Sequence, residues 1–186
     1  LSTVQNDPAS AESFIQGLLL QPGVIPGVLL YTSLLVPLIE ELLKPLAVWL
    51  LAWRRLDPRQ GFILGMLSGA AFALIEAVSA LSMAASSGWW SLAVSRAGTS
   101  LLHITTSGLM GWAIARAFST RKILPLAGVY ALAVGIHGLW NASAIFEGLK
   151  PLLPMQWKLN GVLAVPMLII LVLIMLLILL GTNRRL

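Results

Sequence analysis

Apolar runs close to 20 residues long recur along this chain of 186 residues, and no other feature limits its fold as strongly. A run of that length crosses the roughly 30 Å hydrocarbon core of a bilayer as an α-helix. Only 10% of the residues are charged, whereas a soluble domain carries about 25%. The sequence therefore predicts an all-α, polytopic transmembrane helix bundle, with one membrane domain and no soluble domain.

The apolar runs predict about five spanning helices. They are expected at residues 24–53, 61–84, 92–117, 122–146 and 160–182. Residues 1–22 are expected to form an N-terminal interfacial segment, and residues 23–183 the membrane domain. Pro37 is expected to kink the first span. The last span has no ionisable residue between Val162 and Leu180, which predicts a structural helix that faces lipid.

The net charge of +5 comes from basic residues concentrated on one side of the predicted spans. Eight of them lie in short connections or after the last span: Arg54, Arg55, Arg59, Arg116, Arg121, Lys122, Arg184 and Arg185. The positive-inside rule places the C-terminus in the cytoplasm and the N-terminus outside. Trp89, Trp90 and Trp157 then fall at the outer interface. Because topology accounts for the basic residues, we expect membrane lipids as partners and no nucleic acid.

Four of the predicted spans carry ionisable residues, which are expensive to place in hydrocarbon and usually mark function. A distance of 13 to 15 residues separates the cytoplasmic end of each span from Glu40, Glu76, His103 and His137. At about 1.5 Å per residue, all four lie roughly 20 Å from the cytoplasmic boundary. This common depth predicts one polar site built from four helices, with Glu41 beside Glu40.

The faces of the predicted helices agree with a single site. Small residues at a spacing of four form a stripe along the second span: Gly61, Gly65, Gly69 and Ala73. Such a stripe lets two helices approach closely, and it turns Glu76 toward the interior. His137 and Asn141 share one face of the fourth span. Lys44 is within reach of the glutamate pair, so a structural salt bridge is the alternative to a functional pair. Arg96 either snorkels to the outer interface or pairs with a buried carboxylate.

One chemistry that fits these residues is metal-assisted hydrolysis. Zinc takes histidine nitrogen and glutamate oxygen, and three protein ligands leave a position for water. Glu76, His103 and His137 are the expected ligands, and Glu40 or Glu41 is the general base.

A second chemistry needs no metal. One glutamate of the pair activates water directly, while His137 and Asn141 stabilise the oxyanion. Lys44 sets the charge state of the glutamate pair in either chemistry. Two other functions remain open. One is a non-catalytic membrane scaffold or binding protein with a structural polar cluster. The other is a proton or ion pathway, which the apolar residues on the cytoplasmic side of the cluster argue against.

The segments that hold these residues resemble the motifs of the PrsW intramembrane proteases. Residues 40–44 resemble their Glu-Glu-x-x-Lys motif, and residues 72–76 resemble their Phe-x-x-x-Glu motif. Residues 96–111, with His103 at their centre, and residues 137–141 are similar to the third and fourth motifs. The CAAX prenyl proteases and bacteriocin-processing enzymes are a more distant resemblance.

The resemblance implies an intramembrane endopeptidase that cuts membrane-anchored proteins or peptides. It also implies a multi-pass protein of a cell membrane, with a prokaryotic inner or plasma membrane as the expectation. Zinc is an expected cofactor, although the resemblance leaves the choice between a metalloprotease and a glutamic protease open. The catalytic residues expected from the motifs are Glu40, Glu41, Lys44, Glu76, His103, His137 and Asn141.

Overall fold

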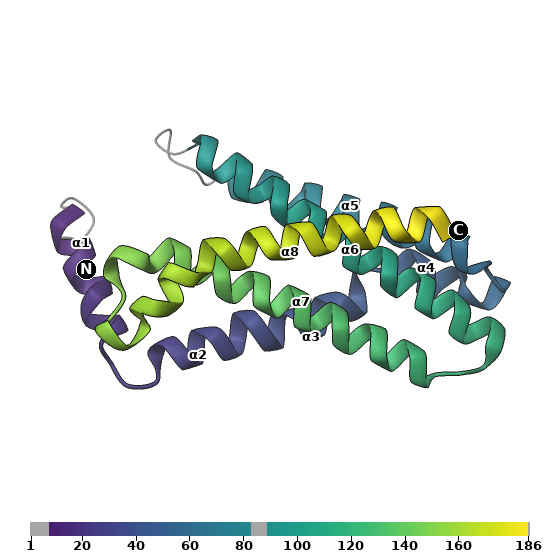
Figure 1. Ribbon diagram of the computed structural model, residues 1–186, viewed down its shortest axis with the longest axis horizontal. Coiled ribbons are helices and arrows are strands. Elements are labelled where there is room, and N and C mark those ends of the chain that lie inside the picture. Colours follow the sequence, from purple (N-terminus) through teal and green to yellow (C-terminus); the bar gives the residue numbers. More distant parts are fainter. Residues whose placement is uncertain (1–7, 83–88, 186) are drawn as a thin grey trace.

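The computed structural model describes residues 8–82 and 89–185, which form helices and short connections (Figure 1). Helices make up 92% of the structure, and the described residues contain no strand, so the all-α expectation is confirmed. Residues 1–7 of the predicted interfacial segment lie outside the described residues. So do residues 83 and 84, with which the predicted second span ends.

The helices follow one another along the chain with few long connections. In order, they are α1 (Pro8–Leu19), α2 (Val24–Leu30), the π-helix η1 (Tyr31–Leu35), α3 (Val36–Leu43), α4 (Leu46–Leu51), the 3-10 turn η2 (Ala52–Arg54), α5 (Pro58–Ser82), α6 (Trp89–Thr120), α7 (Leu124–Leu149), the 3-10 turns η3 (Lys150–Leu152) and η4 (Met155–Trp157), and α8 (Lys158–Arg185).

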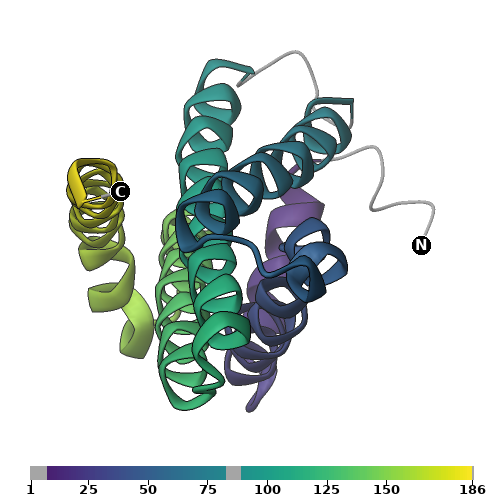
Figure 2. The ribbon, with the colours of Figure 1, turned by 90° about the vertical axis from the view of Figure 1, so that its right-hand side faces the viewer.

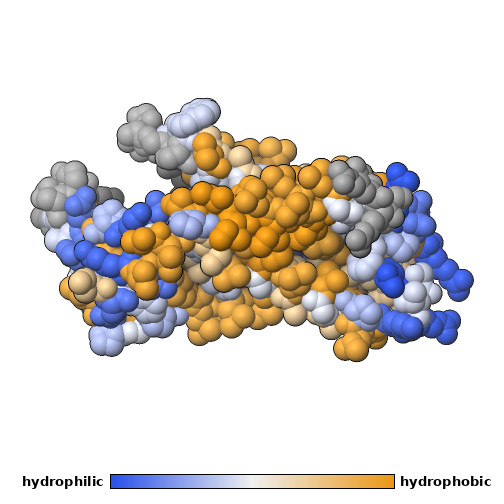
Figure 3. Space-filling view, viewed as in Figure 1, coloured by the Kyte–Doolittle hydropathy of each residue, from blue (hydrophilic) through white to orange (hydrophobic). Residues whose placement is uncertain are grey.

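The surface of the bundle is that of a membrane protein. A broad hydrophobic band covers its middle, and hydrophilic residues gather at both ends (Figure 3). Three described helical segments are long and apolar enough to cross a membrane, at Pro58–Ser82, Leu124–Leu152 and Met155–Thr182. A fourth candidate is the bent path that joins Ser10–Leu19 to Val24–Arg54 at 82°. The chain is therefore a multi-pass membrane protein with three to four candidate spans among the described residues, compared with the five predicted.

The difference in span count comes from α6, which was predicted as a span at residues 92–117. With 32 residues this helix is long enough to cross a membrane, but its mean hydropathy is too low for a membrane span. Its polar side chains include Thr105, Thr106 and Ser107, all of which are fully buried. In an end-on view, α6 lies among the other helices while α8 lies at the outside (Figure 2). Helix packing, and not lipid, surrounds most of its polar groups.

The predicted first span is a broken path, and the main break is at Pro45. Proline has no amide hydrogen to donate to the preceding turn, and Pro45 has φ −78° and ψ 31°, outside the helical range. After the break, Val48 N donates to the carbonyl oxygen of Pro45 and not to that of Lys44. The carbonyl oxygen of Lys44 accepts a hydrogen bond from Ser68 Oγ at 2.5 Å. Pro37, the predicted kink, lies in the first turn of α3 directly after the π-helix. The break holds Lys44 at the end of α3, against α5.

The small-residue stripe of α5 packs on α6 as predicted. A side chain at each of its three glycines would collide with α6, and the facing pairs are Gly61 with Gly111, Gly65 with Ser107, and Gly69 with His103. Each step of four residues along α5 matches a step of four residues back along α6. The contact is therefore antiparallel with one fixed register. Seven residues beyond Gly69 on α5 is Glu76, and seven residues before His103 on α6 is Arg96, so the same register places these two residues opposite each other.

Apolar side chains enclose the polar interior from both directions. Toward the end that carries the 52–57 and 121–123 connections, the buried cluster consists of Val48, Ala52, Met110, Ile114 and Ala133. Toward the opposite end it consists of Leu19, Ile25, Phe146, Leu153 and Ala164. A polar route toward the end with the 52–57 and 121–123 connections would have to pass the first cluster, which argues against the proton or ion pathway.

Candidate active site

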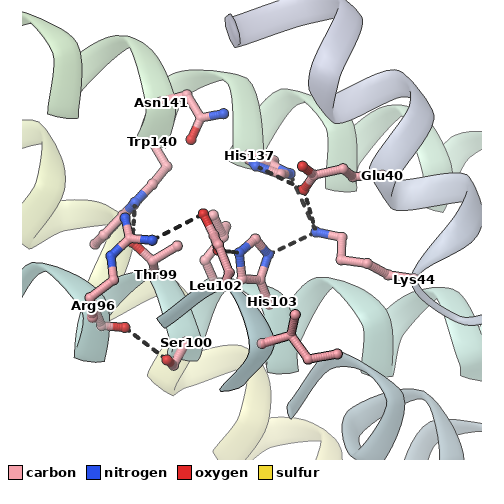
Figure 4. Close-up of polar contacts among 12 residues, drawn as sticks. Glu40, Lys44, Arg96, Thr99, Ser100, Leu102, His103, His137, Trp140 and Asn141 are labelled. Atoms are coloured by element: carbon pink, nitrogen blue, oxygen red, sulfur yellow. Dashed lines mark hydrogen bonds and ion pairs between the residues drawn. The ribbon is translucent and has the colours of Figure 1, made fainter. Parts of the chain in front are cut away.

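The structure brings six of the seven predicted site residues into one cluster, from α3, α5, α6 and α7. They are Glu40, Glu41, Lys44, Glu76, His103 and His137. Glu40, Lys44, His103 and His137 turn toward one another between the helices (Figure 4). Residues 59 and 93 positions away from Lys44 in sequence thus lie next to its ammonium group.

Glu41 and His137 form an inner pair. Glu41 Oε1 lies 2.7 Å from His137 Nδ1 and 2.5 Å from Lys44 Nζ. The side chains of Glu41 and Lys44 have no solvent exposure, and that of His137 has 3%. A buried charge is tolerated only when it is paired and hydrogen-bonded. Lys44 therefore balances Glu41 within the bundle.

Glu76 and His103 form an outer pair. Glu76 Oε2 lies 2.7 Å from His103 Nε2, and Glu76 Oε1 lies 3.0 Å from Arg96 Nη1. The Glu76 side chain is 41% exposed, so the prediction that it turns toward the packed interior is wrong, and this pair lies at the open side of the cluster. Arg96 does pair with a carboxylate, although this carboxylate is partly exposed and not buried as expected.

Each imidazole has a carboxylate on one nitrogen and turns its other nitrogen inward. An ionised carboxylate only accepts hydrogen bonds, so His137 donates from Nδ1 and His103 donates from Nε2. His103 Nδ1 then faces Lys44 Nζ at 2.9 Å, and His137 Nε2 lies 3.8 Å from Glu40 Oε2. A carboxylate behind an imidazole is the usual way in which a protein orients a histidine that binds a metal.

Glu40 is the carboxylate on the inward side of His137, next to Lys44. Its Oε2 lies 3.8 Å from Lys44 Nζ and 3.8 Å from His137 Nε2. This oxygen is buried and has no hydrogen-bond partner, although the side chain as a whole is 26% exposed. Glu40 thus has a partly exposed side chain and turns an oxygen without a hydrogen-bond partner into the cluster, within 4.8 Å of two imidazoles.

Glu40, His103 and His137 together can hold a metal ion. One ligand atom from each lies within 4.8 Å of the others. A carboxylate and two imidazoles are ligands that zinc takes in catalytic sites, and the carboxylates behind both imidazoles fit that use. The Lys44 ammonium takes the same lone pair of His103 Nδ1, so Lys44 has to withdraw when a metal binds there.

The sequence analysis predicted Glu76 as the carboxylate ligand and Glu40 or Glu41 as the general base. The structure places it behind His103, on the nitrogen that points away from Lys44. It is not in the group that can hold a metal. Its assignment as a ligand stays a prediction, and its observed contact is with the histidine itself.

Asn141 lies one turn after His137 on α7. Its Nδ2 donates to the carbonyl oxygen of Thr32, within the π-helix, at 2.8 Å. Next to it, the Cα of Gly138 approaches the backbone of Ser33 so closely that no side chain would fit. A single turn of π-helix inside an α-helix often occurs at functional sites. The π-helix and α7 thus meet at the site, and the oxyanion role of Asn141 stays a prediction.

Sequence reasoning missed the polar chain that runs from the outer pair toward α7. Arg96 Nη2 lies 3.4 Å from Thr99 Oγ1, and Trp140 Nε1 lies 3.2 Å from the same oxygen (Figure 4). The signal for Arg96 is its spacing of seven residues from His103, which puts both side chains on one helix face. Nothing in the sequence indicates that Trp140 reaches across to Thr99.

Comparison with known proteins gives one match. The protein-family model described as "PrsW family intramembrane metalloprotease" matches residues 9–178. The matched region contains every residue of the cluster. No curated protein matches the chain, and no solved structure matches it.

Proposed function

The chain belongs to the PrsW family of intramembrane metalloproteases and is itself an intramembrane protease, and from this premise we propose that it hydrolyses peptide bonds of membrane-anchored proteins with a water activated by Glu40. The observation that carries the proposal is the free Oε2 of Glu40, 3.8 Å from His137 Nε2 and from Lys44 Nζ. A carboxylate oxygen without a hydrogen-bond partner is available to accept a proton.

Glu40 acts as the general base. A proton passes from water to the Glu40 carboxylate, and the resulting hydroxide attacks the scissile carbonyl carbon. The C–N bond then breaks as the protonated Glu40 returns the proton to the leaving amine. The products are a carboxylic acid and an amine. Glu41 also has a buried Oε2 without a hydrogen-bond partner, but its Oε1 is bound to both Lys44 and His137. Glu40 is favoured because its side chain is 26% exposed, whereas that of Glu41 has no solvent exposure.

The other residues position groups or stabilise charge. Glu41 orients His137, and Glu76 orients His103. Lys44 offsets the charge of the glutamate pair. Asn141 has a second amide hydrogen beyond the one given to Thr32, which makes it the proposed donor to the oxyanion of the tetrahedral intermediate.

Zinc is the proposed metal, held by Glu40, His103 and His137. When bound, it supplies a Lewis acid that polarises the scissile carbonyl and makes water more acidic. A carboxylate has two oxygens, so Glu40 can serve the metal with one and accept the proton with the other.

The proposed topology has α6 as a fifth span, the N-terminus outside and the C-terminus in the cytoplasm, in a prokaryotic inner or plasma membrane. In support, the 52–57 and 121–123 connections and the C-terminal end of α8 lie at one end of the bundle, while α1 lies at the other (Figure 1). The 82° bend after α1 supports residues 1–22 as an interfacial segment before the membrane domain at 23–183.

The test is cleavage of a membrane-anchored peptide by purified protein in liposomes. Glu40→Ala, Glu41→Ala and His137→Ala should each abolish cleavage, because each removes the base or its support. Glu12→Ala, an exposed change in α1, is the control and should cleave as the wild type does. Cleavage that survives all three site changes contradicts the proposal and favours a non-catalytic scaffold.

A further inference from the structure

Arg96 is held at both of its terminal nitrogens. Thr99 Oγ1 donates to the carbonyl oxygen of Ser95 at 3.0 Å, and it accepts from Trp140 Nε1 at 3.2 Å and from Arg96 Nη2 at 3.4 Å. A hydroxyl has one hydrogen and two lone pairs, so this hydroxyl is fully used and its direction is fixed. The indole of Trp140 packs against Gly98, where a side chain would collide with it. One end of the guanidinium is therefore anchored.

The other end of the guanidinium fixes Glu76. The helix register set by the glycine stripe of α5 brings Glu76 opposite Arg96, and the Arg96 Nη1 to Glu76 Oε1 distance is 3.0 Å. The second oxygen, Oε2, is then directed at His103 Nε2, 2.7 Å away. Because the Glu76 side chain is 41% exposed, its surroundings do not lock it. Apart from His103 itself, Arg96 is the residue that Glu76 is bound to among the described contacts.

Glu76 on one side and Lys44 on the other together set the proton position on His103. A carboxylate that only accepts hydrogen bonds requires the hydrogen on Nε2. The lone pair of Nδ1 is then left to face Lys44 Nζ at 2.9 Å, on the side of Glu40. In the opposite tautomer, the inward nitrogen carries a hydrogen and faces an ammonium that also donates, which is repulsive.

We propose that Arg96 is a positioning residue that acts through Glu76 to keep His103 with its hydrogen on Nε2 and its Nδ1 lone pair toward Glu40. Its consequence for catalysis rests on the proposed function. The effect of Arg96 on the orientation of His103 is independent of the proposed function, because the Nδ1 lone pair of His103 faces the same way whether it binds Lys44 or a metal. Arg96 itself contacts neither Glu40 nor His137 among the described contacts.

Nitrogen-15 NMR of the imidazoles tests this inference on metal-free protein in detergent. The chain has two histidines, so two sets of imidazole signals are expected, and a His137→Asn sample assigns them. At about pH 8 a free imidazole is neutral, and the two nitrogens then report which one carries the hydrogen. Wild-type His103 should show protonated Nε2 and unprotonated Nδ1.

Arg96→Gln should shift both nitrogen signals of His103 toward a mixture of tautomers and leave those of His137 in place. It should also lower kcat for the membrane-anchored peptide by about 10- to 100-fold, as the loss of a residue that supports a metal ligand usually does, with a smaller change in KM. Arg96→Lys should recover part of both effects, since lysine keeps the charge but cannot reach Glu76 and Thr99 together. The matched control is Arg116→Gln on the same helix, where the guanidinium lies over the Trp112 ring.

If Arg96→Gln loses helical content, Arg96→Lys carries the comparison. The inference is overturned if the His103 signals of the folded Arg96 variants match those of the wild type and of Arg116→Gln. Wild-type protein with the expected His103 tautomer but no cleavage overturns the proposed function and leaves the inference standing. A shifted His103 with reduced kcat supports both.

Discussion

The inner pair Glu41–His137 and the outer pair Glu76–His103 use the same carboxylate–imidazole bond in different surroundings. Both bonds are 2.7 Å long. The inner carboxylate has no solvent exposure and is balanced by Lys44, whereas the outer one is 41% exposed and is balanced by Arg96. The compact ammonium fits between α3, α6 and α7, and the planar guanidinium bridges two acceptors at the edge.

Because of this difference, we expect the inner pair to determine the stability of the fold and the outer pair to determine the orientation of His103. An uncompensated charge in the buried inner pair has no water to relieve it, so that pair should determine whether the bundle folds. The outer carboxylate is partly exposed, so changes in the outer pair should alter the orientation of His103 more than the stability of the bundle. The following changes test this division, from the largest expected effect to the smallest.

Glu41→Gln should lower the free energy of unfolding by about 3–5 kcal/mol, because it leaves the buried Lys44 charge without its closest partner. Glu40, at 3.8 Å from Lys44 Nζ, is the remaining carboxylate nearby. The measurement is chemical unfolding in detergent. Glu147→Gln is the control: it removes an exposed pair with Lys150 at 3.8 Å, and should change stability by at most about 1 kcal/mol. Equal effects of the two changes would contradict the division.

Gly65→Ala should lower the free energy of unfolding by about 1–3 kcal/mol, because its new methyl group meets the backbone of Ser107 and over-packs the α5–α6 contact. Gly135→Ala is a matched control on α7, where a methyl group has nothing within 4 Å. Unfolding measurements should separate the two. The His103 signals should also shift in Gly65→Ala, and a shift confined to His137 would contradict the assignment of register to the glycine stripe.

Lys44→Met should raise zinc affinity by at least about tenfold, or about 1.4 kcal/mol. The ammonium lies 2.9 Å from His103 Nδ1 and competes for the lone pair that a metal needs. Zinc titration of chelator-treated protein measures this change, with Lys150→Met as an exposed control. An unchanged or lower affinity would show that Lys44 does not occupy the metal's place.

Asn141→Ala should lower the free energy of unfolding by only about 0.6 kcal/mol, the usual size for one hydrogen bond between membrane helices. The bond lost is that to the Thr32 carbonyl at 2.8 Å. Cleavage should fall by more than this loss explains if the amide also serves the oxyanion. Thr32→Val, which keeps the carbonyl, is the control for packing at this contact. Cleavage as fast as in the wild type would remove Asn141 from the catalytic residues.

The sequence predicts the parts of this site that depend on depth and helix face. The helical repeat brings Glu40, Glu76, His103 and His137 to one level, and the glycine stripe predicts that α5 packs closely on another helix, which the structure shows to be α6. The break at Pro45 was not predicted, because a proline is compatible with both a kink and a full interruption, and nothing in the sequence indicates that Ser68 Oγ donates to the Lys44 carbonyl oxygen. The sequence also could not predict that Glu40, and not Glu76, groups with the two histidines as a possible metal ligand. That grouping depends on which nitrogen of His103 faces inward.

Cleavage by metal-free wild-type protein is the most direct test of the central claim, that Glu40, His103 and His137 form the metal centre of the protease. Protein stripped with a chelator should not cut a membrane-anchored peptide, and one equivalent of Zn²⁺ per chain should restore cleavage. Glu40→Gln treated in the same way should recover no activity with zinc. Undiminished cleavage by the stripped wild-type protein would contradict the claim and leave Glu40 as the base of a metal-free glutamic protease.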